Sequence, residues 1–399
     1  MRSLRALDAL HFALADGRDG LGPFLAVFLA SRHWDQRGIG AAMSAMTIAT
    51  VVAQVPAGGF IDGARRKRLI IVVASIVVAA GCVLMARRDD FSTVIVAQLG
   101  ISAATAFLGP ALTGITLGLV GRGAFSKRMG RNEAFNHAGN VVTTLTAGYL
   151  GDHVSTRAIF DQVALTALAS AAATFLIRGR EIDPALARGA DLDAAHPPRI
   201  AAIGALMRDR RIVAFVAATA LFHLGNAAML PLVGIKITDG KSSGVATDMS
   251  ACIIAAQLVM IPVAIVSTRL ADRWGRRPVL LIGFGVLPIR GLLYTLSTDR
   301  AFLVAVQLLD GVGAAVLGVV GVLVIADLTR GTGRFNLMQG VLAAATGVGA
   351  SLSNLVNGFV VHHAGFDAGF IALAGFATLA WLFLQFTLPE TRPSPCVAT

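Results

Sequence analysis

Residues 69–85 read LIIVVASIVVAAGCVLM, an apolar run that contains no charged side chain. Similar apolar runs occupy residues 94–108 and 368–386. An α-helix needs about 20 apolar residues to cross roughly 30 Å of hydrocarbon, and several of these runs reach that length once their weakly polar flanks are included. A water-soluble core could not use so many such runs, so the sequence predicts a membrane protein that crosses the bilayer many times as helices.

The composition of the whole chain agrees with this prediction. Of its 399 residues, 55% are hydrophobic and 14% are charged, whereas soluble domains are about 45–50% apolar and about 25% charged. The net charge of +11 could suggest a protein that binds nucleic acid. The basic residues alternate with the apolar runs and form no separate basic patch, so we expect no nucleic-acid partner.

Twelve segments are apolar and long enough to be spans. We predict them at residues 6–30, 38–60, 69–87, 92–120, 132–151, 158–177, 211–235, 247–268, 278–297, 301–327, 336–360 and 367–389. With the N-terminus in the cytoplasm, the cytoplasmic loops hold 24 of the 34 Lys and Arg residues and the outer loops hold 8. By the positive-inside rule, this bias predicts a multi-pass protein of the bacterial inner membrane with both termini in the cytoplasm.

The first six spans resemble the last six at a nearly constant offset of about 209 residues. For example, Gln98 and Leu99 recur as Gln307 and Leu308. Parallel repeats of this kind are typical of transporters whose substrate site lies between two halves near the middle of the membrane. We therefore predict six-helix bundles at residues 1–177 and 211–390, a cytoplasmic linker at 178–210, and a short cytoplasmic tail at 391–399.

Two loops carry related charged motifs. Residues 58–68 read GGFIDGARRKR, and residues 268–278 read TRLADRWGRRP. Both resemble the signature that the major facilitator superfamily carries between helices two and three and again between helices eight and nine. This resemblance implies an all-α membrane protein with the fold of that superfamily, twelve transmembrane helices in two pseudo-symmetric six-helix bundles. It also implies a small bacterial transporter of the efflux type.

The resemblance further implies a cytoplasmic gate. In the family, a carboxylate at the end of one helix accepts hydrogen bonds from the N-terminus of a neighbouring helix, where the helix dipole favours a negative charge. Asp62 would then brace the eleventh span, and Asp272 would brace the fifth. The first copy departs from the motif at Gly63 and Arg65, and the second departs at Thr268. The implied gate residues are Gly58, Asp62, Arg66, Asp272, Arg273, Gly275, Arg276 and Arg277; the alternative is that they only set the topology.

Polar side chains inside the predicted spans form the candidate cavity for substrate and protons. Ionisable groups are costly in lipid, so they usually face a cavity or a partner. We expect Asp16 or Asp19 to take up a proton and Arg18 to hold its partner or an anionic substrate. The full set is Asp16, Arg18, Asp19, Asn136, His137, Asn140, His223, Asn226, Asp310, Asn354 and Asn357. The alternatives are an internal ion pair for the charged groups and hydrogen bonds between helices for the amides.

Two further charged residues lie within the second half. We expect a transport role for Asp310, which lies in the middle of the tenth span, and a structural role for Arg290 in the ninth. Two departures from the family weaken a drug–proton antiport interpretation. Gln98 stands where many proton-driven members have an arginine, and the fifth span lacks the Gly-Pro pair of many drug antiporters.

These observations predict a secondary active transporter that moves a small solute by alternating access. Proton-coupled export of a drug, siderophore or metabolite is the leading hypothesis, whereas an uptake permease, a lipid flippase and a membrane-embedded sensor are the alternatives. We expect a monomer that is not an enzyme and that uses no cofactor or metal. Its expected partners are a small-molecule substrate, the proton as coupling ion, and membrane lipids.

Overall fold

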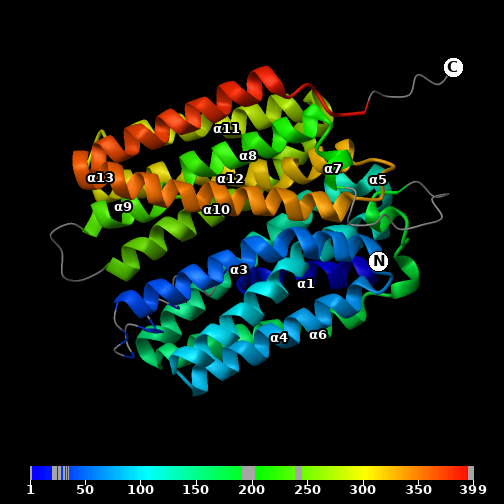
Figure 1. The fold of residues 1–399 in the computed structure, drawn as a ribbon, viewed down its shortest axis with the longest axis horizontal. Helices are drawn as coiled ribbons and strands as arrows, with labels where there is room; N and C mark the ends of the chain where they lie inside the picture. Colours follow the sequence, from blue (N-terminus) through cyan, green and yellow to red (C-terminus); the bar gives the residue numbers. More distant parts are fainter. Residues whose placement is uncertain are drawn as a thin grey trace. The chain divides into compact units, whose positions relative to one another are not determined.

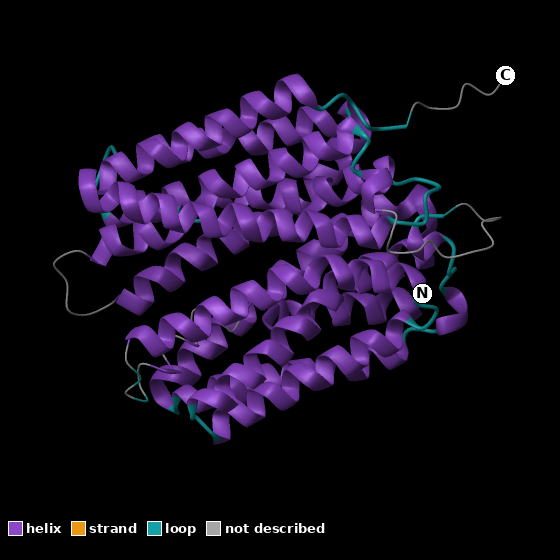
Figure 2. Ribbon diagram, in the orientation of Figure 1, coloured by secondary structure: helices purple, strands orange, loops and turns teal. Residues whose placement is uncertain are grey.

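The computed structural model describes residues 2–19, 25, 28, 29, 32, 34, 36–190, 203–238 and 245–393. Over these residues the chain forms helices and connecting loops without a β-strand (Figure 2). Eight helical stretches are long and apolar enough to cross a membrane. They contain ten of the twelve predicted spans, and the other two predicted spans correspond to the more polar helices α1 and α11.

The chain divides into two compact units. The first unit contains residues Met1–Ile200 and Asn336–Ala344, and the second contains Ala201–Phe335 and Ala345–Thr399. Figure 1 shows the order of their helices along the chain. The helix α13, Phe335–Thr387, contributes its first turns to the first unit and its remainder to the second.

In the first unit, α5 is the central helix. It packs against α1, α3, α4 and α6, and α4 also packs along α6. Small and branched apolar side chains of these helices form the core, in which Leu7, Ile71 and Phe160 are fully buried. The bounds are Arg2–Asp19 for α1, Gln36–Gly63 for α3, Lys67–Arg87 for α4, Phe91–His153 for α5 and Thr156–Leu176 for α6, followed by the 3₁₀ turns Gly179–Glu181 and Leu186–Arg188.

In the second unit, α12 packs against α10 and α11 and also touches α8 and α9. Its core includes the fully buried side chains of Met229, Phe284 and Phe370. The bounds are Ile203–Leu206 for α7, Arg210–Asn226 for α8, Met229–Thr238 for α9, Val245–Trp274 for α10, Arg276–Leu293 for α11 and Arg300–Leu328 for α12.

The helices of two predicted spans, the fifth and the seventh, differ from the predicted boundaries. Helix α5 holds the fourth and fifth spans and α13 holds the last two, with non-helical backbone at Gly121 (φ 67°) and Gly365 (φ 84°). Because only glycine adopts such positive φ at little cost, these residues allow the chain to turn between spans. The helix that contains the fifth span thus begins directly after Gly121, ten residues before the predicted start of that span. Residues 122–131 include four basic side chains and are too polar to suggest a span, but polarity does not prevent them from forming a helix.

The seventh span is also not one helix. The structure divides residues 211–235 into α8, which ends at Asn226, and α9, which begins at Met229. Pro231 explains the break, because its ring clashes with the carbonyl four residues earlier, that of Ala227. The N–H of Ala228 donates to the hydroxyl of Ser353 on α13 at 3.0 Å, so a side chain from another helix satisfies the interrupted backbone.

Helix starts fall into two groups. Asp90, Ser155, Asp209 and Asp299 precede α5, α6, α8 and α12, and each accepts a hydrogen bond from a backbone N–H of the first turn, which is the usual way to stabilise a helix N-terminus. In contrast, the residues that precede α4, α11 and α13 make no such bond with their side chains. These three helix starts coincide with the charged motifs and with the candidate gate.

Candidate functional site

A polar cluster lies inside the second unit, among helices that are otherwise apolar. Its centre is Arg290 of α11, whose side chain is 0% exposed. The Nη1 atom of Arg290 donates to Asp310 Oδ1 at 2.7 Å and to Asn226 Oδ1 at 2.6 Å. Its Nη2 donates to Gln307 Oε1 at 3.1 Å, and its Nε donates to the Tyr294 hydroxyl at 3.2 Å. The buried guanidinium is therefore both charge-paired and hydrogen-bonded, as a charge removed from water must be.

The other members of this polar cluster also bond to one another. The Tyr294 hydroxyl donates to Gln307 Oε1, and Gln307 Nε2 donates to Asp310 Oδ2 at 3.1 Å. Helix geometry explains how the sequence builds the cluster, because residues three or four apart share one face. Arg290 and Tyr294 share a face of α11, and Gln307 and Asp310 share a face of α12. Asn226, the last residue of α8, adds the third helix at the point where the seventh span breaks.

Asp62 at the end of α3 caps the first turn of α13 within the first unit. Its Oδ1 accepts from the backbone N–H of Asn336 at 3.0 Å, and its Oδ2 accepts from that of Leu337 at 2.8 Å. The side-chain amide of Asn336 also donates to Asp62 at 2.7 Å and to the carbonyl oxygen of Ala187 at 2.8 Å. A buried carboxylate thus occupies the positive end of the helix dipole, where it is stabilised.

Gly58 permits this close approach of α3 to α13. A Cβ atom at Gly58 would clash with the backbone carbonyl of Asn336. Arg66, by contrast, is exposed, and it directly precedes α4. The structure therefore shows Gly58 and Asp62 at one contact with the start of α13, whereas Arg66 lies beside it at the start of α4.

The second copy of the motif surrounds the start of α11 in the second unit. Arg276 Nη1 donates to Asp272 Oδ1 at 2.7 Å, and its Nε donates to Asp327 Oδ2 at 3.1 Å. Gly275 has a φ of 105°, a conformation that favours glycine. The backbone N–H groups of Arg276 and Arg277 both donate to the carboxylate of Glu390, at 2.8 and 3.1 Å.

Glu390 is the carboxylate that completes this site, and it comes from just beyond the last helix. Burial alone would raise the pKa of Glu390, but hydrogen bonds from the backbone N–H groups of Arg392, Arg276, Arg277 and Thr391 outweigh burial and lower that pKa. Arg392 in turn donates to the carbonyl oxygen of Arg273 at 3.0 Å. The bracing of the fifth span by Asp272 stays a prediction.

An ion cluster in the first unit joins α1 to α5. Asp8 accepts from Arg128 Nη2 at 2.7 Å and from Arg131 Nη2 at 2.9 Å. Arg128 also donates to the carbonyl oxygen of Leu4 at 3.0 Å. The sequence analysis did not predict this cluster, and none of its three members is in the predicted site. Asp8 is 120 positions from Arg128 and 123 from Arg131, so only the packing of α1 on α5 brings it to the two arginines.

The remaining predicted cavity residues are dispersed. Asp16, Arg18 and Asp19 lie in the last turn of α1, but their side chains are outside the described residues. Asn136 and Asn140 are buried on α5, where Asn136 Nδ2 donates to Glu133 Oε2 at 3.3 Å, and the neighbouring His137 is half-buried.

Three more predicted residues lie on α8 and α13. His223 lies edge-on to the ring of Phe222, with ring centroids 5.3 Å apart. Asn354 is exposed and donates to the carbonyl oxygen of Ala350, whereas Asn357 is buried. Of the predicted cavity residues, the structure brings Asn226 and Asp310 together, because both accept hydrogen bonds from Arg290. The site partners missed from the sequence are Tyr294, Gln307, Asp327 and Glu390; the helical spacings of Tyr294 from Arg290 and of Gln307 from Asp310 were the available signals.

Comparisons with known proteins agree with this architecture. A sequence profile described as Major Facilitator Superfamily matches residues 8–287 and 241–396. An uncharacterized MFS-type transporter of Mycobacterium tuberculosis is 45% identical over 396 residues, which cover 98% of this chain and 94% of the relative. Multidrug resistance protein 1 of Bacillus subtilis is 28% identical over 194 residues, or 47% of this chain and 48% of that protein.

Solved structures show the same fold at low identity. The transporter FucP in its outward conformation superposes with a TM-score of 0.72 at 16% identity, over 97% of this chain and 99% of FucP. The human organic anion transporter MFSD10 superposes with a TM-score of 0.69 at 16% identity, over 96% and 99% of the two chains. The predicted all-α membrane fold is confirmed, and the chain belongs to the major facilitator superfamily of transporters.

Proposed function

We propose that this protein is a proton-coupled secondary active transporter that exports a small organic solute by alternating access. The pair of the fully buried Arg290 and the half-buried Asp310 is the observation that carries the proposal. An ionisable pair inside a membrane-spanning bundle is costly, and such pairs commonly serve proton or substrate movement. Here Arg290 is bonded both to Asp310 and to Asn226, at the break of the seventh span. A change in the charge of Asp310 would therefore alter the hydrogen bonds of Arg290 at a point where a helix can bend.

The coupling step is a proton transfer to and from Asp310. When Asp310 takes up a proton, its charge is neutralised and the attraction of Arg290 for it falls. Arg290 then depends on Asn226, Gln307 and Tyr294, so the end of α8 shifts relative to α11. Loss of the proton to the other side of the membrane restores the ion pair. A ligand or proton can shift such an equilibrium only by its different affinity for the two states.

The contact of Asp62 with the start of α13 is the proposed gate. Its three hydrogen bonds close one conformation and must break in the other. Charge-assisted bonds of this kind are stronger than neutral ones but each contributes only about 1.5–3 kcal/mol, an amount that substrate and proton binding can overcome. This magnitude suits a gate better than a permanent structural support.

Separate observations support export, proton coupling and the location in the membrane. The relative from Bacillus subtilis is named a multidrug resistance protein, which supports export, whereas the E. coli FucP is described as a fucose:proton symporter, which supports proton coupling. The excess of Lys and Arg in the predicted cytoplasmic loops supports an inner-membrane location with both termini in the cytoplasm.

The test uses inverted membrane vesicles with ethidium, a cationic dye, and a panel of uncharged and anionic solutes as probes. Wild type should accumulate at least one probe when the vesicle interior is acidic, and Asp310→Asn should reduce this accumulation at least tenfold. Asp161→Asn, which changes an exposed carboxylate of α6, is the control and should transport normally. Accumulation by Asp310→Asn at the wild-type rate and with the wild-type pH dependence would contradict the role of Asp310.

A further inference from the structure

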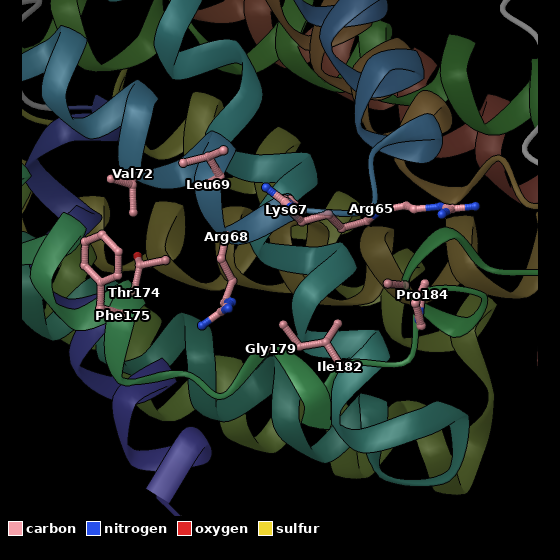
Figure 3. Close-up of a pocket in the computed structure, with 12 residues that line it drawn as sticks. Arg65, Lys67, Arg68, Leu69, Val72, Thr174, Phe175, Gly179, Ile182 and Pro184 are labelled. Atoms are coloured by element: carbon pink, nitrogen blue, oxygen red, sulfur yellow. The ribbon is translucent and has the colours of Figure 1, made fainter.

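We propose that a cavity in the first unit, between the start of α4 and the end of α6, binds the phosphate group of an anionic phospholipid. The cavity has a volume of about 480 Å³. Figure 3 shows it between the basic residues that begin α4 and the segment that follows α6. This proposal is independent of the transported solute and of the coupling ion.

The basic wall of the cavity consists of four consecutive residues, Arg65 to Arg68. Two of them are engaged by the protein. Lys67 Nζ donates to the carbonyl oxygens of Ile61 and Ala64 at 2.7 and 2.9 Å, and Arg68 Nη1 donates to that of Ile177. These acceptors are neutral, so they do not cancel the charge. Arg65 and Arg66 are exposed. The cavity therefore has a strong positive charge that an anion would balance.

In the second unit, a carboxylate occupies the position that corresponds to the start of α4. Helix α11 begins at Arg276, and α4 begins at Lys67, 209 residues earlier. At α11, the carboxylate of Glu390 accepts from the first two backbone N–H groups of the helix. The residue 209 positions before Glu390 is Glu181, which instead pairs with Arg178 at 3.4 Å.

The first unit thus has the helix start and the basic residues, but no described carboxylate accepts from the first N–H groups of that helix. Among the described residues, no side chain accepts from the N–H groups of Lys67 or Arg68. Asp62 is close enough to Lys67 for an electrostatic interaction, but its carboxylate oxygens accept from the backbone N–H groups of Asn336 and Leu337. Asp183 accepts from the backbone N–H groups of Ala185 and Leu186. We infer that the anion at this position is supplied from outside the chain.

The apolar side of the cavity identifies the source of that anion as a lipid. Leu69 is 51% exposed and Phe175 is 70% exposed, and both line the cavity. Exposed Val73 and Ile76 extend this apolar surface along α4 toward the membrane interior. A free phosphate would use only the arginines, whereas a phospholipid also covers this surface with its acyl chain. Basic residues beside a membrane-spanning helix commonly bind anionic headgroups.

The test is native mass spectrometry of the full-length protein with phosphatidylglycerol, and with phosphatidylcholine as the zwitterionic reference. Wild type should bind phosphatidylglycerol more tightly than phosphatidylcholine. Removing one arginine near a charged surface costs about 1 kcal/mol, or about fivefold in affinity, so Arg65→Ala with Arg66→Ala should weaken phosphatidylglycerol binding about 25-fold. The control changes Arg87 and Arg88, which are exposed at the opposite end of α4, to alanine and should leave this site unchanged.

A second variant fills the cavity without removing a positive charge. Gly179 faces the guanidinium of Arg68, and an added Cβ would lie 2.5 Å from its Nη2, the mobile end of a side chain. Gly179→Asp should therefore supply an internal carboxylate, as Glu390 does, and should also weaken phosphatidylglycerol binding. Equal binding of both lipids, equal losses in the Arg87 and Arg88 control, or displacement of the lipid by millimolar inorganic phosphate would each overturn the lipid proposal.

Discussion

The two units place different residues at corresponding points of the same helix pair. In the second unit, α11 and α12 carry Arg290, Tyr294, Gln307 and Asp310. The positions 209 residues earlier, on α4 and α5, are Gly81, Met85, Gln98 and Ile101. There the Gln98 amide donates to the Met85 sulfur at 3.2 Å, and a Cβ at Gly81 would lie 2.7 Å from the Ile101 side chain. One unit has a charged cluster where the other has an uncharged contact.

This difference shows that the helix pair does not need the charged cluster in order to pack. Both versions are buried, and Gln98 and Gln307 are 0% exposed in each unit. Replacing a buried ion pair by well-packed apolar residues is often neutral or stabilising. The charges of the second unit are therefore not explained by stability, which supports the proposal that Asp310 and Arg290 act in transport.

The largest expected effect on stability comes from removing one partner of the charged cluster. Arg290→Ala leaves Asp310, whose side chain is 13% exposed, without its cation, so it should destabilise the protein by about 3 kcal/mol, the lower end of the cost of breaking a buried pair. The triple variant Arg290→Gly, Tyr294→Met and Asp310→Ile copies the first unit and should be close to wild type in stability. Thermal unfolding in detergent measures both variants.

Transport separates the two explanations of the cluster. The triple variant should fold but should no longer accumulate solute in response to a pH gradient in inverted vesicles. If the triple variant transports like wild type, the cluster has no role in coupling. If it unfolds as readily as Arg290→Ala, the cluster is needed for packing and the comparison of the two units fails.

An intermediate effect on stability should distinguish Asp62 and Asp272, the carboxylates of the two motif copies. Asp62 is 3% exposed and caps a helix with three hydrogen bonds, so Asp62→Ala should cost about 2 kcal/mol because it leaves buried donors unsatisfied. The side chain of Asp272 is 49% exposed and pairs with Arg276, so Asp272→Ala should cost less than about 1 kcal/mol. Chemical or thermal unfolding of the two variants side by side measures the difference; equal losses would contradict it.

The smallest expected effect concerns the two glutamates that follow the sixth and twelfth spans. Glu390→Gln should cost about 1 kcal/mol, the usual cost of losing a helix cap, whereas Glu181→Gln should change little because its pairing is on the surface. The pKa of Glu390 is lowered from its ordinary value of 4.5. Its contribution to stability is therefore complete above pH 4.5 and is lost as the pH falls through the lower folded value.

The pH dependence provides the measurement for this last comparison. As the pH falls below 4.5, the unfolding midpoint of wild type should decrease. The midpoint of Glu390→Gln should decrease less over the same pH interval. Glu181→Gln serves as the matched control and should follow wild type more closely. An identical pH dependence of wild type and Glu390→Gln would show that the cap on α11 does not contribute.

The sequence was sufficient for the fold because membrane insertion depends mainly on the length and apolarity of each segment. The run at residues 69–85, the bias of basic residues and the offset of about 209 residues predicted the all-α membrane protein, and the loop at residues 58–68 indicated its superfamily. Helix limits were less predictable. Gly121 and Pro231 decide where helices break, and these breaks depend on backbone geometry that apolarity does not report.

The candidate site was predictable only where a residue type is itself unusual in its surroundings. A carboxylate inside an apolar span, such as Asp310, is conspicuous in the sequence. Its partner Arg290 is on another helix, and the bonds of Asn226 and Gln307 to that arginine depend on how α8, α11 and α12 pack. The caps formed by Asp62 and Glu390 likewise join residues more than 100 positions apart.

The sequence by itself thus determined that this chain enters a membrane as helices in two related halves, because that outcome depends on local apolarity and charge. Only the tertiary structure decided which charges are paired, which helix starts receive a carboxylate, and which one does not. Those outcomes depend on distances of a few ångströms between side chains from different helices, and neither composition nor spacing along the chain encodes such distances directly.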